Sequence, residues 1–74
     1  MVMDVKVSAK KVVLGNITFW KGYWIIKNDA GNCIRKTIDI IRKTCYDAEL
    51  DAIKNATLFA EQNQITLKPI ANTI

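Results

Sequence analysis

Histidine is absent from this chain of 74 residues. Its absence removes the side chain that most often acts as a general base near neutral pH, and also the commonest zinc ligand. The two cysteines, Cys33 and Cys45, are too few to complete a structural zinc site by themselves. The three glycines stand singly, so no glycine-rich phosphate loop is present. The sequence therefore predicts a protein that is not an enzyme and that needs no metal and no cofactor.

Long apolar runs are also missing. No stretch approaches the ~20 apolar residues that a membrane-spanning helix needs, and the early Asp4 argues against a signal peptide. If residues 33–41 are extended, Cys33 and Cys45 lie too far apart for a disulfide, which requires Cα atoms within about 7 Å. Two free thiols are typical of a reducing compartment. We therefore expect a cytoplasmic protein that does not contact a membrane.

A folded core is nevertheless expected. Half of the residues are apolar, six are aromatic and one is proline, a composition that excludes a disordered chain. The length fits one small domain spanning residues 1–74. Small domains of this composition, without catalytic motifs, fit accessory proteins of phages and mobile elements.

The charge is distributed unevenly along the chain. Residues 1–45 contain nine basic and three acidic residues, a net charge of +6, whereas residues 46–74 contain two basic and four acidic residues, a net charge of −2. Such asymmetry indicates either a surface that faces a polyanion or one that is complementary to itself. A solvated surface with accidental segregation of charge is the alternative.

Three strands are predicted in the first part of the chain, over residues 4–14, 17–28 and 33–42. The first alternates apolar and polar residues, and the second is rich in aromatic and β-branched residues. The third is ambiguous with a helix, but six of its residues between 34 and 44 are β-branched. Gly22 interrupts the second strand, and we interpret it as a bulge, with a tight hairpin turn as the alternative.

A helix is predicted over residues 45–62. Thr44 and Asp47 have the spacing of a capping box, and Asn63 is expected to end the helix in a left-handed conformation. The helical wheel groups one set of apolar residues on a single face: Tyr46, Ala48, Leu50, Ala52, Ile53, Ala56, Phe59 and Ala60. Asn55 falls on the polar side, and residues 65–74 form a short edge strand or a tail.

These elements define an α+β fold. The expected architecture is an antiparallel meander of three strands, or four with the short edge strand, packed on one C-terminal amphipathic helix in the order β-β-β-α. Because side chains alternate along a strand, Phe19 and Tyr23 share one face of an uninterrupted second strand, and Trp20 and Trp24 share the other. A bulge at Gly22 would exchange the pairing after it, but each face would still carry aromatic rings. One helix covers only one of these faces. The second face is therefore either closed by other parts of the chain or left as a binding surface.

Two functions follow from an uncovered face. The first is protein–protein interaction or self-association, with Trp20 or Trp24 as the anchor and lysines at the rim, because tryptophan and tyrosine often dominate interface energies. The alternative is nucleic-acid binding by a basic, aromatic-rich sheet. Since only two arginines are present, the sequence favours the protein partner or homodimer. The candidate surface consists of Trp20, Lys21, Tyr23, Trp24, Lys27, Arg35, Lys36, Arg42 and Lys43.

Overall fold

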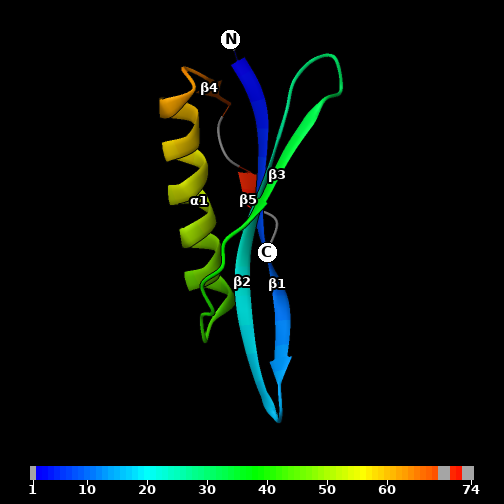
Figure 1. Cartoon of the computed structure of the whole chain (residues 1–74), viewed down its shortest axis with the longest axis vertical. Coiled ribbons are helices and arrows are strands. Elements are labelled where there is room, and N and C mark those ends of the chain that lie inside the picture. Colours follow the sequence, from blue (N-terminus) through cyan, green and yellow to red (C-terminus); the bar gives the residue numbers. More distant parts are fainter. Residues whose placement is uncertain (1, 69–70, 73–74) are drawn as a thin grey trace.

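The computed structural model describes residues 2–68 and 71–72, and it is an α+β fold as predicted. A sheet of β-strands packs against a single helix (Figure 1). The elements follow in the order β1 (Val2–Leu14), β2 (Ile17–Lys27), β3 (Cys33–Thr37), α1 (Cys45–Gln62), β4 (Thr66–Leu67) and β5 (Ala71–Asn72). Among the described residues, no helix has both the length and the apolar character that crossing a bilayer requires.

The sheet is mixed rather than purely antiparallel. Its order is β3-β2-β1-β4, with β5 also paired to β1. The β1–β2 and β2–β3 pairs are antiparallel, as the predicted meander requires. However, β4 and β5 run parallel to β1. The reason is that α1 returns the chain to the end of the sheet where β1 begins, so the next strand has the direction of β1 (Figure 1).

The third strand is shorter than predicted, because it ends at Thr37 rather than at residue 42. The chain then leaves the sheet to reach the start of α1, and the Ile38 N–H donates to the Gly22 carbonyl at 2.7 Å. Only Arg42 pairs again with β2, through two backbone hydrogen bonds of 2.8 Å with Trp20. The β-branched residues of this segment therefore form a connection and not a strand.

Gly22 is neither a bulge nor a turn. The register between β1 and β2 is continuous through this position, with Gly22 opposite Ala9. A Cβ atom at Gly22 would overlap the backbone carbonyl oxygen of Ala48 and would lie 3.1 Å from the Cβ of Ala52. The missing side chain is therefore what allows α1 to lie directly on the sheet.

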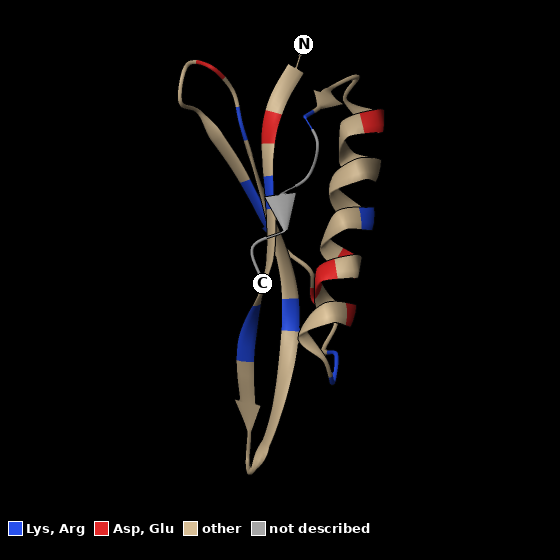
Figure 2. Ribbon diagram, turned by 180° about the vertical axis from the view of Figure 1, so that it is seen from behind, with Lys and Arg blue, Asp and Glu red and all other residues tan. Residues whose placement is uncertain are grey.

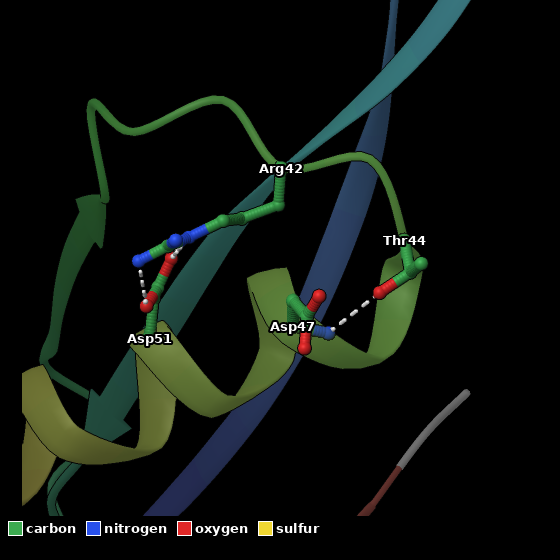
Figure 3. A network of polar contacts seen from close by, with 4 residues as sticks. All are labelled: Arg42, Thr44, Asp47 and Asp51. Carbon is green, nitrogen blue, oxygen red and sulfur yellow. Dashed lines mark hydrogen bonds and ion pairs between the residues drawn. The ribbon is translucent and has the colours of Figure 1, made fainter.

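The helix has the predicted bounds and the predicted cap. The Thr44 Oγ1 accepts a hydrogen bond of 3.1 Å from the backbone N–H of Asp47 (Figure 3). Its buried face is narrower than the wheel indicated, because it follows alanines spaced four residues apart: Ala48, Ala52, Ala56 and Ala60. Tyr46, expected on this face, is 65% exposed, and Asn55, expected on the polar side, contacts the sheet.

The end of the helix differs from the prediction in one residue. Asn63 has a φ of −108°, and the left-handed conformation occurs at Gln64, with a φ of 55°. Asn63 instead closes the last turn with its side-chain amide, which donates to the Phe59 carbonyl at 2.8 Å. The expected edge strand or tail over residues 65–74 contains β4 and β5, and residues 69–70 and 73–74 of that segment lie outside the described residues.

Trp24 is the largest side chain in the core. It is 1% exposed and packs between the sheet and α1, with its ring centroid 5.0 Å from that of Phe59. Its indole N–H donates a hydrogen bond of 2.8 Å to the Asn55 Oδ1, so the polar atom of the ring is satisfied. Smaller buried residues complete the core around it: Val5, Val7, Ile26, Ile38, Ala52 and Ala56.

One acidic side chain is enclosed with these apolar residues. Glu49 of α1 is 3% exposed, and its Oε1 has no hydrogen-bond partner among the described residues. A buried carboxylate oxygen without a donor opposes folding, because it has lost its hydration without gaining a replacement.

We expect Glu49→Met to stabilise the fold by roughly 1–2 kcal/mol, since methionine keeps the volume and removes the unsatisfied oxygen. Thermal and urea unfolding followed by circular dichroism would measure the change. Glu61→Met is the matched control, because Glu61 is an exposed acid on the same helix and its replacement should leave the midpoint unchanged. A lower midpoint for Glu49→Met would contradict this interpretation of Glu49.

Candidate functional site

The two faces of the sheet differ completely in their surroundings. α1 covers the face that carries Val5, Val7 and Trp24. Within residues 2–68 and 71–72, no helix or strand packs on the opposite side (Figure 1). Because side chains alternate along strands, this side carries the even-numbered residues of β1 and the odd-numbered residues of β2 and β3. We call it the open face.

The open face is strongly basic. Five cations belong to it: Lys6, Lys10, Lys21, Lys27 and Arg35. Among the strand residues described on this face, Asp4 is the one acid, and its carboxylate pairs with Lys68 at 3.0 Å. Lys10 lies directly opposite Lys21 in the register. Like charges in such a pair repel, so they add positive potential and not stability to the sheet.

Most of these cations are not neutralised by a nearby carboxylate of the described residues. Lys21 pairs with Asp39 at 3.0 Å, but that carboxylate is 95% exposed and the contact is readily exchanged. The other four cations of the open face have no ion-pair partner among the described residues. A ligand with several negative charges would therefore displace little when it binds this face.

A shallow concavity lies in the middle of the open face. Its volume is about 450 Å³, and it is lined by Lys10, Tyr23, Ile25, Arg35, Lys36 and Thr37. Tyr23 of β2 and Thr37 of β3 are directly opposite each other in the register, and both line the concavity. The concavity thus combines cations, an aromatic ring and hydroxyl groups, the side-chain types that interact with phosphates and bases in other proteins.

The acidic residues are concentrated on the other side of the molecule. Four of the seven acidic residues, Asp47, Glu49, Asp51 and Glu61, lie on α1, whereas seven of the eleven basic residues lie on β1, β2 and β3 (Figure 2). The charge asymmetry of the sequence is therefore an asymmetry in space, with a positive sheet and a negative helix. This arrangement orients a polyanion toward the open face and away from α1.

The structure brings together about half of the predicted surface. Lys21, Tyr23, Lys27 and Arg35 lie on the open face, and Lys36 lines the concavity from β3. Trp24, proposed as an anchor, is in the core and is not accessible to any partner. The prediction for Trp24 was wrong because the side of the strand that α1 covers is the side that carries this ring.

Three other predicted residues lie away from the open face. Trp20 is half-buried on the helix side of β2, and Lys43 is exposed in the connection before α1. Arg42 donates two hydrogen bonds to the Asp51 carboxylate, of 2.7 Å from Nε and 3.0 Å from Nη2 (Figure 3). Asp51, mainly by accepting these bonds, raises the pKa of Arg42 above its ordinary value. Arg42 thus ties the connection to the helix.

The sequence analysis missed Lys6 and Lys10. Both belong to the open face, and Lys10 lines the concavity. The signal was present in the alternation of β1, because the buried Val5 and Val7 have the opposite parity to these two lysines. Applying the face rule to the first strand as well as the second would have found them.

The described residues contain few other side chains that could act as nucleophiles or metal ligands. Both cysteines are free, with Cys33 exposed, and burial together with the Glu49 carboxylate raises the pKa of the Cys45 thiol above its ordinary value. A thiol with a raised pKa is a weak nucleophile. No cluster of three metal-ligating side chains occurs within the described part of the chain.

Comparison with known protein families, curated proteins and solved structures gives no match to this chain.

Proposed function

We propose that this protein binds nucleic acid through the open face of its sheet. The observation that carries the proposal is the concavity of the open face that is lined by Tyr23 together with the cations Lys10 and Arg35. Phosphate groups are bound by clustered cations, and bases stack on aromatic rings. Both requirements meet within one surface that also lacks a covering element among the described residues.

Each side chain has a distinct part in this mechanism. Arg35 is suited to a bidentate contact with a phosphate, whereas the lysines act as point charges along the backbone. Tyr23 offers a ring face for stacking and a hydroxyl for hydrogen bonding. The negative α1 lies behind the sheet, so that repulsion from the nucleic acid favours the orientation in which the open face leads.

Self-association is the second candidate. β3 forms one edge of the sheet, and all five of its residues are exposed. An exposed edge strand can pair with a strand from a second copy. The protein-interaction hypothesis named Trp20 or Trp24 as its anchor, but Trp24 is buried, and Trp20 is half-buried on the side of the sheet opposite to the open face. Nucleic-acid binding is therefore the better supported function. The two free thiols support its taking place in the cytoplasm.

The double variant Lys10→Glu/Arg35→Glu is expected to weaken binding by about 100-fold at low salt, because it reverses two charges of the concavity. The measurement is fluorescence anisotropy of labelled duplex and single-stranded oligonucleotides at increasing salt. In the wild type, the logarithm of the affinity should fall linearly with the logarithm of the salt concentration.

Lys54→Glu provides the matched control, because Lys54 is an exposed lysine of α1, on the other side of the molecule. Its affinity should stay within roughly twofold of the wild type, since the same charge change occurs far from the open face. Light scattering on the same samples reports the mass. A wild type that is dimeric and does not bind either oligonucleotide would reject nucleic-acid binding in favour of self-association.

A further inference from the structure

The hairpin formed by residues 10–21 extends beyond the helix (Figure 1). Its root is marked by Gly22, which lies under Ala48 near the start of α1. Beyond this point no residue of the hairpin is buried. The molecule measures 44 × 21 × 17 Å, and its radius of gyration of 12.9 Å exceeds the ~11 Å of a compact domain of this length. We call residues 10–21 the hairpin arm.

The tip of the hairpin arm is apolar. Val13, Leu14 and Ile17 flank the turn and are 62%, 51% and 59% exposed. Leu14 and Ile17 are paired in the register and lie on the same side as the open face. Exposed apolar side chains at a projecting tip do not stabilise the core, and a cluster of them marks a contact surface.

The base of the hairpin arm is cationic on both sides. Lys10 belongs to the open face, and Lys11, its neighbour in β1, points to the other side, where its Nζ lies 6.0 Å from the centre of the Trp20 ring. No acidic residue occurs within residues 10–21. The hairpin arm thus has an apolar tip, and behind the tip it carries positive charge on both faces. This arrangement is complementary to a groove bordered by two phosphate backbones.

We infer that the hairpin arm enters a groove of duplex DNA and inserts Leu14 and Ile17 between base pairs, bending the duplex. This inference rests on the proposed function and specifies that the nucleic acid bound is double-stranded DNA. The five residue pairs from Lys10–Lys21 to Leu14–Ile17 span about 14 Å, more than the ~8 Å depth of a groove. Apolar wedges at a groove floor unstack base steps and kink the helix axis.

Continuity with the open face favours DNA over a lipid surface as the occupant. Lys10 belongs both to the hairpin arm and to the concavity around Tyr23. A duplex whose groove holds the tip therefore passes its phosphate backbone over the concavity, and a single ligand accounts for both features. A flat bilayer would contact the apolar tip at the end of the arm, leaving the lysines at its base and the concavity without a ligand.

The test is energy transfer between dyes at the two ends of a duplex of about 30 base pairs, a length that bends little unless protein deforms it. The wild type should shorten the distance between the dyes, and Leu14→Ser/Ile17→Ser should abolish the shortening. This variant should still bind with the wild-type salt dependence, because its lysines are intact. Leu58→Ser, at an exposed apolar residue of α1, is the matched control and should bend the duplex like the wild type.

The outcomes separate the two proposals. Binding by the wild type without any shortening would overturn the wedge and leave the proposed function standing, as would shortening that Leu14→Ser/Ile17→Ser retains. Failure of the wild type to bind any oligonucleotide at low salt would overturn both. Binding to phosphatidylserine vesicles that is lost in Leu14→Ser/Ile17→Ser, without shortening of the duplex, would reassign the hairpin arm to a membrane surface.

Discussion

Gly22→Ala is expected to destabilise the protein by about 3 kcal/mol, which lowers the thermal midpoint by roughly 15 °C for a domain of this size. The added Cβ would overlap the Ala48 carbonyl oxygen, an atom of the helix backbone that cannot move aside as a flexible side chain does. Relief requires α1 to lift from the sheet, and the contacts around Trp24 are then lost. Circular dichroism during heating would measure the midpoint.

Gly15→Asn controls for the general effect of removing a glycine. Gly15 has a φ of 62°, which asparagine tolerates, and no atom lies within 4 Å of the position of its Cβ. Its midpoint should therefore stay within a few degrees of the wild type. If Gly15→Asn lost as much stability as Gly22→Ala, the effect at Gly22 would not result from the close packing of α1 on this residue.

Trp24→Ala is expected to cost about 3–5 kcal/mol, comparable to the total stability of a domain of this length, so that much of the protein should be unfolded. The variant loses the ring that packs on Phe59 and leaves the Asn55 Oδ1 without its donor. Urea unfolding and the width of amide resonances in NMR spectra would report the loss. Trp24→Phe, which keeps an aromatic ring and loses the hydrogen bond, should fall between this variant and the wild type.

Tyr23→Ala is the informative comparison, because Tyr23 precedes Trp24 in the sequence but lies on the open face. We expect it to cost about 1 kcal/mol, in the range of a cross-strand contact, and to weaken oligonucleotide binding. If Trp24→Ala remained folded while Tyr23→Ala unfolded, the two faces of β2 would have been assigned in the wrong order.

The helix and the first hairpin were predictable from local signals, whereas the third strand was predicted too long. The bounds of α1 follow from the Thr44 cap and from an amphipathic pattern of 18 residues. The β1–β2 hairpin follows from alternation on both sides of Gly15 and Asn16. Such signals depend on residues near in sequence, so the sequence alone was sufficient for them.

Alternation within β2 alone did not indicate which face of the sheet α1 covers, because both faces of β2 carry aromatic rings. Gly22 settles the question, since it makes room for the helix on the side of Trp24 and Ile26. In the same way, the alanines of α1 define its buried face, whereas a hydrophobicity wheel gives more weight to Tyr46 and Leu50. Close contact between backbones selects the smallest residues, which hydrophobicity scales rank low.

The site was partly predictable for a related reason. Lys21, Lys27 and Arg35 share one face of the sheet, but Arg42 is held by Asp51 on α1, a partner that no local pattern indicates. The parallel pairing of β4 and β5 with β1 likewise depends on where α1 returns the chain. Contacts that join distant parts of the sequence follow from the packing of the whole domain.

The position of β1 in the sheet has a consequence for how the protein folds while it is being synthesised. β1 precedes the other described elements in the chain, yet Val2 and Met3 have their parallel partners in Thr66 and Leu67. On the ribosome, one edge of β1 therefore stays unpaired until nearly the whole described chain has emerged. Pairing of segments so distant in sequence is slow. Until it occurs, the nascent chain exposes an unpaired strand edge, and such an edge can pair with other chains and cause aggregation.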